Sequence, residues 1–172
     1  MKKKIILWLI GLIGLLVAAF FCVGIFVPSV EYTTTVEVNR PRDVTWQVMR
    51  DRKDWVYGFK SFEQLSGTPN EVGNKARITV VRDGAEMTFD SELKQIKPPE
   101  MAETELTSGM LVHDAVVTLT ENGGKTTIVS KEKITGSNPF YRSLFVLLKS
   151  RITAVSARNF EGLKQAVESA GN

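Results

Sequence analysis

The sequence predicts an α+β domain of about six or seven antiparallel strands and a long C-terminal helix, preceded by an apolar N-terminal helix. Three observations support this class. An uncharged apolar run fills residues 5–27, glycine-containing turns divide the middle of the chain into short alternating segments, and an amphipathic pattern occupies residues 137–172. We expect the order to be one strand, two short helices, about six strands and one long helix.

The apolar run is about 23 residues long, enough to cross the roughly 30 Å hydrocarbon core of a bilayer as a helix. Lysines at positions 2–4 precede it, which predicts a cytoplasmic N-terminus and a following domain on the extracytoplasmic (periplasmic) side. A cleaved signal peptide is the alternative, but its apolar region is shorter and ends at small residues, whereas Phe20 and Phe21 follow the alanines here. We therefore expect an uncleaved single-pass anchor.

This anchor defines the predicted domains: a cytoplasmic tip at residues 1–4, a transmembrane helix at 5–27, a linker at 28–30 and a folded domain at 31–172. A linker of a few extended residues reaches only about 10 Å. The lipid bilayer is therefore an expected partner of the folded domain.

The charge balance and the scarcity of cysteine and histidine exclude several classes of function. The three N-terminal lysines account for the whole formal net charge of +3, so the remaining chain is neutral and nucleic acid is not an expected partner. The single cysteine, Cys22, lies in the apolar run, and His113 is the only histidine, so neither a disulfide nor a metal site is expected. The chain has no glycine-rich phosphate-binding loop, and we expect no cofactor.

The first elements of the domain follow from local pattern. Residues 31–39 are rich in β-branched side chains and predict a strand. Pro41 then opens a predicted helix at residues 42–50, and a second short helix is predicted at 51–59. Another strand is expected at 61–66.

Two turn signals set the registers of two hairpins, at Asp83-Gly84 and at Gly123-Gly124. Pairing across the first turn sets three pairs of residues opposite each other: Val80 and Met87, Ile78 and Phe89, Arg77 and Asp90. Pairing across the second turn sets three more: Leu119 and Ile128, Val117 and Ser130, Ala115 and Glu132. The core pairs match apolar with apolar and Arg77 faces an acid, which supports these registers.

The C-terminal pattern predicts one helix of about 30 residues, roughly 45 Å long. Asn138 is a good helix cap and Pro139 is suited to the first helical position. Apolar residues then recur at spacings of three and four, at Leu144, Leu148, Ile152, Val155, Leu163 and Val167. Such a helix needs a large apolar surface to cover.

The order of elements resembles the START-like or SRPBCC superfamily, which includes polyketide cyclases, lipid-transfer domains and the birch-pollen allergen type. The resemblance covers roughly residues 31–170 and rests on these residues: Val38-Asn39-Arg40-Pro41, Val44, Trp46, Asp51, Trp55, Gly67, Gly73, Phe160, Leu163-Lys164 and Glu168. It implies the helix-grip fold, a curved sheet wrapped around the long C-terminal helix and enclosing a cavity for a hydrophobic ligand. It implies no universal catalytic motif and does not name the ligand.

The predicted parities select the residues that would line this cavity. The sheet would contribute apolar side chains and a few polar ones: Ile78, Val80, Met87, Phe89, Leu106, Val117, His113, Ser130 and Glu132. The helix would contribute Leu144, Leu148, Ile152 and Val155.

Among these residues only His113 and Glu132 are weak candidates for catalysis, about 7 Å apart by strand geometry. An apolar pocket would raise the pKa of Glu132, and a neighbouring histidine could share its proton, as an acid/base pair or as a clamp for a ligand headgroup. The alternative is that a bulge turns Glu132 to solvent while His113 bonds to backbone near a strand end.

Two further groups have alternative interpretations. The aromatic residues either surround a cavity mouth, contact the membrane interface or fill the core: Trp46, Trp55, Tyr57, Phe59 and Tyr141. The basic residues of the long helix either face solvent or attract anionic headgroups: Arg142, Lys149, Arg151 and Arg158.

The sequence thus favours a membrane-anchored domain that binds a hydrophobic small molecule, a lipid above all. One alternative is an enzyme of the cyclase or dehydratase kind that uses the same cavity. The other is a non-catalytic module that binds a protein partner at the membrane. The sequence leaves open whether the protein is an enzyme.

Overall fold

The structure, a computed structural model, describes residues 2–170. Residue 1 of the predicted tip and residues 171–172 of the predicted C-terminal helix lie outside the described residues. The elements in chain order are α1 (Lys2–Phe26), β1 (Ser29–Val38), α2 (Arg42–Asp51), β2 (Phe59–Ser66), β3 (Lys75–Arg82), β4 (Ala85–Lys97), β5 (Met101–Thr107), β6 (Leu111–Asn122), β7 (Lys125–Gly136), α3 (Pro139–Leu147) and α4 (Lys149–Ser169).

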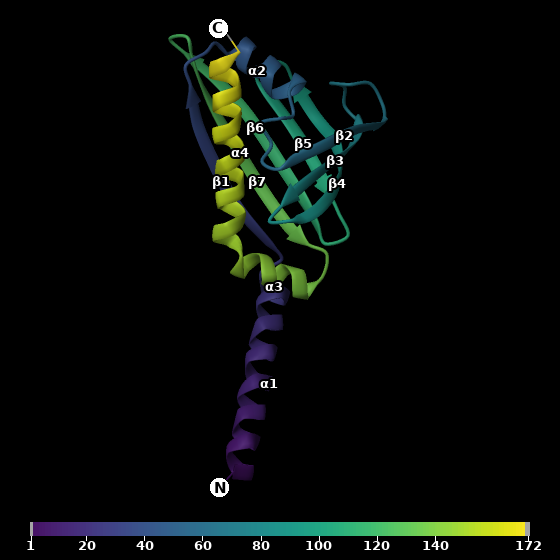
Figure 1. Cartoon of the computed structure of the whole chain (residues 1–172), viewed down its shortest axis with the longest axis vertical. Helices are drawn as coiled ribbons and strands as arrows, with labels where there is room; N and C mark the ends of the chain where they lie inside the picture. The colour runs from purple at the N-terminus through teal and green to yellow at the C-terminus, as the bar shows by residue number, and fades with distance from the viewer. Residues whose placement is uncertain (1, 171–172) are drawn as a thin grey trace.

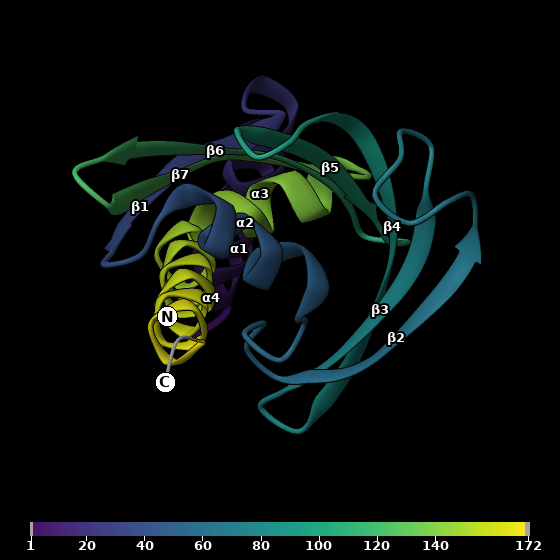
Figure 2. The same cartoon turned by 90° about the horizontal axis from the view of Figure 1, so that it is seen from above.

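The seven strands form one antiparallel sheet in the order β1-β7-β6-β5-β4-β3-β2. The first and last strands are therefore neighbours. The sheet curves around α4, which lies beside β1 and β7 while β2, β3 and β4 bend away from it (Figure 2). This arrangement confirms the predicted fold class.

Both predicted hairpin registers are confirmed. Val80 pairs with Met87 and Leu119 pairs with Ile128, and the other predicted partners follow in step. The turns form where left-handed backbone is needed, since Gly84 has a φ of +78°. Apolar side chains therefore share one face of the sheet, the face toward α4.

The second short helix predicted after the first strand is absent from the described chain. Residues 54–58 form turns instead, held by backbone bonds from Val56 to Lys53 and from Phe59 to Val56. Gly58 has a φ of +76°, which a continuing helix does not allow. The segment is also tied to α4, because the side chain of Asn159 accepts a hydrogen bond from the backbone N–H of Tyr57 at 2.8 Å.

The prediction of a single long C-terminal helix was also wrong in one respect, because the helix is divided at Leu148 into α3 and α4. The predicted cap is present: the Asn138 side chain accepts a hydrogen bond from the backbone of Tyr141, and Pro139 occupies the first turn. Leu148 leaves helical geometry with a ψ of 8°. The two helices pack on different partners, α3 on α1 and α4 on β1, and α3 crosses the base of the domain (Figure 1). One straight helix could not reach both surfaces.

The apolar core lies at the end of the domain farthest from α1. There the C-terminal half of α4 packs against α2 and against β1, β6 and β7. The core residues are Val38, Val48, Met49, Leu119, Ile128, Phe160, Leu163, Ala166 and Val167.

Helix α1 contacts α3 near its C-terminal end, and the rest of it extends away from the domain (Figure 1). Its segment Lys3–Phe26 contains an 18-residue window with a mean hydropathy of 2.8 and is long and apolar enough to span a membrane. The helix ends at Phe26 and β1 begins at Ser29, so only two residues separate α1 from the sheet.

Candidate functional site

A buried carboxylate lies on the inner face of β7, next to the edge strand β1. Glu132 on β7 is only 8% exposed. It accepts hydrogen bonds from the hydroxyl of Tyr32 on β1 at 2.9 Å, from the hydroxyl of Ser156 on α4, and it bonds Nε2 of His113 on β6 at 3.0 Å. Four elements therefore meet at one side chain, and α4 is tied to the sheet through it.

The structure brings His113 and Glu132 together as the parity predicted. Strands β6 and β7 pair without a register shift, so no bulge turns Glu132 to solvent. The predicted rise in the pKa of Glu132 was wrong. Burial acts to raise that pKa, but hydrogen bonds from His113, Ser156 and Tyr32, with the charge of His113, lower it below its ordinary value. Glu132 is thus an anion at neutral pH and not a proton donor.

This anion has two chemical consequences. Burial and the negative charge of Glu132 raise the pKa of Tyr32, so its phenol stays protonated and donates. The carboxylate of Glu132 also holds Nε2 of His113 and so fixes the orientation of the ring. The His113 side chain is 18% exposed, so the ring is not completely covered by the protein. Its other ring nitrogen, Nδ1, is the atom that could form a hydrogen bond with a ligand.

A second polar side chain lies beside this cluster on the same face. Ser130 is two residues from Glu132 on β7 and is 1% exposed, and within residues 2–170 its hydroxyl has no hydrogen-bond partner. Across the ladder it faces Thr34 and Val117, and Thr34 shares a 2.8 Å hydrogen bond with Ser156. A buried hydroxyl without a partner is costly, and a polar ligand atom would satisfy it.

The predicted apolar lining residues surround these polar groups but are unevenly covered. Val80 is buried. The others are half-buried, on the inner face of the sheet and on the facing side of α3 and α4: Ile78, Met87, Phe89, Leu106, Val117, Leu144, Leu148, Ile152 and Val155. The described chain therefore covers these side chains only in part.

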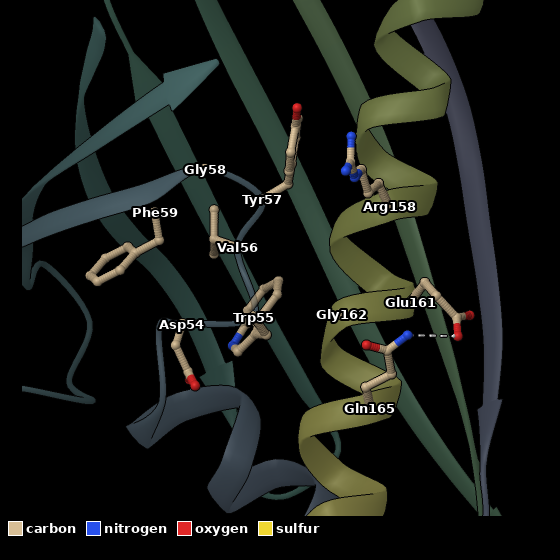
Figure 3. A pocket seen from close by; sticks show the side chains of 10 residues that line it. All are labelled: Asp54, Trp55, Val56, Tyr57, Gly58, Phe59, Arg158, Glu161, Gly162 and Gln165. Atoms are coloured by element: carbon tan, nitrogen blue, oxygen red, sulfur yellow. Dashed lines mark hydrogen bonds between the residues drawn. The ribbon is translucent and has the colours of Figure 1, made fainter. Parts of the chain in front are cut away.

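A pocket of about 620 Å³ lies elsewhere, between α4 and residues 54–59 (Figure 3). It contains none of the predicted lining residues. Trp55, Tyr57 and Phe59 line it from one side, and Arg158 and Gln165 from α4. Two of the predicted mouth aromatics are elsewhere: Trp46 packs against the core and Tyr141 lies on α3.

The wall of this pocket is held in place by Tyr57. The guanidinium of Arg158 lies 3.8 Å from the centre of the Tyr57 ring, in a cation–π contact. On the opposite element, Arg82 donates from Nε to the Tyr57 carbonyl at 3.1 Å. The segment thus connects α4 to β3 and closes one side of the interior.

Sequence reasoning missed three partners in these sites, Tyr32, Ser156 and Asn159. A signal existed for Tyr32, because it alternates in phase with Val30 and Thr34 and so shares the inner face. Ser156 also interrupts the apolar stripe of α4 at a spacing of four from Ile152. In residues 2–170 no cluster of three or more His, Cys, Asp or Glu side chains is placed to hold a metal ion.

The sequence matches no protein-family model and no curated protein. Solved structures match well. TTHA0849 from Thermus thermophilus superposes with a TM-score of 0.67 at 14% identity, over 83% of this chain and 100% of that one. Ara h 8.0201 gives 0.62 at 13% identity, over 82% of this chain and 99% of that one.

A third neighbour is StfQ, a di-domain ARO/CYC protein from the steffimycin biosynthetic pathway. It gives a TM-score of 0.67 at 13% identity, over 82% of this chain and 52% of that one. At such identities the likeness concerns the fold. The chain therefore has the helix-grip fold that the sequence resemblance implied.

Proposed function

We propose that the protein is a single-pass, membrane-anchored domain that binds a hydrophobic small molecule, a lipid, between its sheet and its C-terminal helices. One observation carries this proposal. The inner face of β3 to β6 and the first half of α4 present apolar side chains that are only half-buried. An apolar ligand that covered them would gain about 25 cal/mol for each Å² removed from water.

The polar groups of the inner face indicate the kind of ligand. A lipid has a long apolar part and a few hydrogen-bonding atoms near one end. The hydroxyl of Ser130 lacks a partner among the described residues, and His113 is oriented by Glu132. These two side chains would bond a hydroxyl or carbonyl group, while the surrounding apolar residues cover the chain.

The anchor is α1, with the N-terminal lysines in the cytoplasm and the folded domain on the extracytoplasmic side. Resistance to alkaline carbonate extraction tests the anchoring. Protease accessibility of the domain in intact spheroplasts tests its side of the membrane. Digestion of the domain only after lysis would contradict the predicted topology.

Ligand binding is tested by native mass spectrometry of the detergent-purified full chain, followed by extraction and analysis of the lipid that remains bound. Ile152→Phe would fill the space beside the first half of α4 and should reduce the bound lipid severalfold. Ala154→Phe places the same ring on the exposed side of the same helix and should change nothing. A wild-type domain that carries no lipid and takes up no added lipid would overturn the proposal.

An enzyme of the cyclase or dehydratase kind is the second candidate. The 3.0 Å bond between His113 and Glu132 favours it, because a carboxylate that orients a histidine is a common way to prepare a base. Any activity found should fall at least tenfold in His113→Asn at unchanged thermal stability. Unchanged turnover in that variant would exclude this candidate.

A further inference from the structure

The short helix α3 is packed tightly against the end of α1. The rings of Phe20 and Phe140 lie 5.6 Å apart between centroids, and the hydroxyl of Ser143 donates to the carbonyl of Phe20. Gly24 leaves no space at this seam, because a methyl group there would overlap the carbonyl oxygen of Pro139. The two helices therefore form one unit.

The position of this contact along α1 determines how deep α3 would lie in a bilayer that α1 spans. Phe20 precedes the last residue of α1, Phe26, by six residues, which is about 9 Å along a helix. The interfacial zone on each side of a bilayer is only roughly 5–8 Å thick. If α1 spans the membrane, which is part of the proposed function, the first turn of α3 lies at the boundary between headgroups and acyl chains.

The exposed surface at this end of the domain suits such a place. Phe140 is 47% exposed and Leu147 is 67% exposed. Met110, on the β5–β6 turn, is 39% exposed, and its carbonyl accepts a 2.9 Å hydrogen bond from the backbone of Ser137, just before α3. Exposed apolar groups are thus gathered at the base, where aromatic and aliphatic side chains favour a membrane interface.

The charges near α3 also fit a membrane surface. Residues 137–160 contain four basic side chains and no acidic one. Lys149 and Arg151 follow α3 directly and are both exposed. Basic groups near an anionic leaflet are attracted to its headgroups.

We propose that α3 is an interfacial helix whose partner is the lipid surface of the outer leaflet. Phe140 and Leu147 lie at the acyl boundary, and Lys149 and Arg151 contact anionic headgroups. The half-buried Leu144 and Leu148 then lie within about one helix diameter, roughly 10 Å, of the acyl chains. A lipid can pass from the leaflet to the inner sheet face without crossing bulk water.

Depth measurements on the full chain in nanodiscs test this proposal. Spin labels are attached to Phe140→Cys and Leu147→Cys in a Cys22→Ser background, and to native Cys22 in the wild type. Val72→Cys is the matched control, an apolar position that is 62% exposed on the β2–β3 loop, at the opposite end of the sheet. We expect the labels at 140 and 147 to collide more with oxygen and less with a water-soluble nickel complex than the label at 72.

The outcomes separate the two proposals. The labels at 140 and 147 could prove as accessible to the nickel complex as the label at 72 while Cys22 is protected. That result would overturn the interfacial helix and leave the membrane anchor unaffected. A water-accessible Cys22 would overturn both. Lys149→Glu with Arg151→Glu should move the label at 147 outward in phosphatidylglycerol nanodiscs and not in phosphatidylcholine. An equal position in both lipids would remove the electrostatic part of the proposal.

Discussion

The two halves of α4 have similar apolar spacing but different surroundings. In the half far from α1, Phe160, Leu163 and Val167 are buried against α2 and three strands. In the half near α1, Ile152 and Val155 are only half-buried. The difference lies in what covers them, because α2 lies at the end of the domain away from α1 (Figure 1) and packs against the distal half of α4. An amphipathic stripe therefore shows which side faces inward, but not whether the chain itself fills the inside.

The polar cluster lies between these two halves. Ser156 lies on α4 between the half-buried Ile152 and the buried Phe160, and its hydroxyl donates a hydrogen bond to Glu132. This bond ties α4 to the sheet at the point where the buried half of the helix meets the half-buried one.

The largest effect is expected from truncation in the packed half. Leu163→Ala should lower the free energy of unfolding by about 2–5 kcal/mol, because Leu163 is fully buried and a cavity would remain. Ile152→Ala in the open half should cost about 1 kcal/mol, since its side chain is already partly uncovered. Urea unfolding of the domain in nanodiscs measures both. Equal losses would show that the proximal half is as tightly packed as the distal half.

A smaller, pH-dependent effect on stability is expected at Glu132, in the polar cluster between the two halves of α4. Glu132→Gln should cost about 2 kcal/mol at pH 7, because three donors lose a charged acceptor. The folded pKa of Glu132 is lowered, so its contribution is complete above the ordinary value of 4.5 and is lost as the pH falls through the folded value.

The difference in stability between wild type and Glu132→Gln should therefore shrink below about pH 4.5. Thermal unfolding across pH 3–7 measures it. Glu37→Gln is the control, since Glu37 pairs with Lys125 at the exposed surface and should matter little. A difference that stayed constant down to pH 3 would mean that Glu132 is not the ionised centre of the cluster.

The smallest effect concerns the contact between α4 and residues 54–58. Alanine in place of glycine usually stabilises a helix by about 1 kcal/mol. A methyl group at Gly162 would lie 2.6 Å from the carbonyl oxygen of Trp55, so Gly162→Ala should destabilise the protein instead. Ala154→Gly, the opposite substitution at an exposed position of α4, is the control, because it measures the effect of helix propensity alone. Stabilisation by Gly162→Ala would show that the Trp55 segment moves aside freely.

Local signals explain which parts of the fold were predictable. The Asp83-Gly84 turn and the alternation around it determine a hairpin register within a few residues. The pairing of β1 with β7 has no such signal, because Tyr32 and Glu132 are 100 residues apart. The inward direction of His113 and Glu132 followed from parity, but the lowered pKa of Glu132 depends on Ser156 and Tyr32 as well as on His113, and those two residues come from distant elements.

The division of the C-terminal helix was hidden for a different reason. The apolar spacing continues through Leu144, Leu148 and Ile152 without a proline or glycine, so periodicity alone indicates one helix. The break at Leu148 arises because α3 packs against α1 while α4 packs against β1. These are tertiary contacts, which local spacing does not reveal. The pocket beside Tyr57 was hidden in the same way, since it needs residues 54–59 to lie against Arg158.

The close contact between Gly24 of α1 and Pro139 of α3, with only two residues between α1 and β1, makes α1 and the folded domain move as one rigid unit. In a bilayer, a longer or shorter hydrocarbon span is accommodated by tilting a transmembrane helix. Helix α4 has 21 residues, about 32 Å at 1.5 Å per residue. A change of about 10° in the tilt of α1 then moves the far end of α4 sideways by roughly 5 Å. If α1 spans a membrane, as proposed, the thickness of that membrane sets where the distal loops of the domain point.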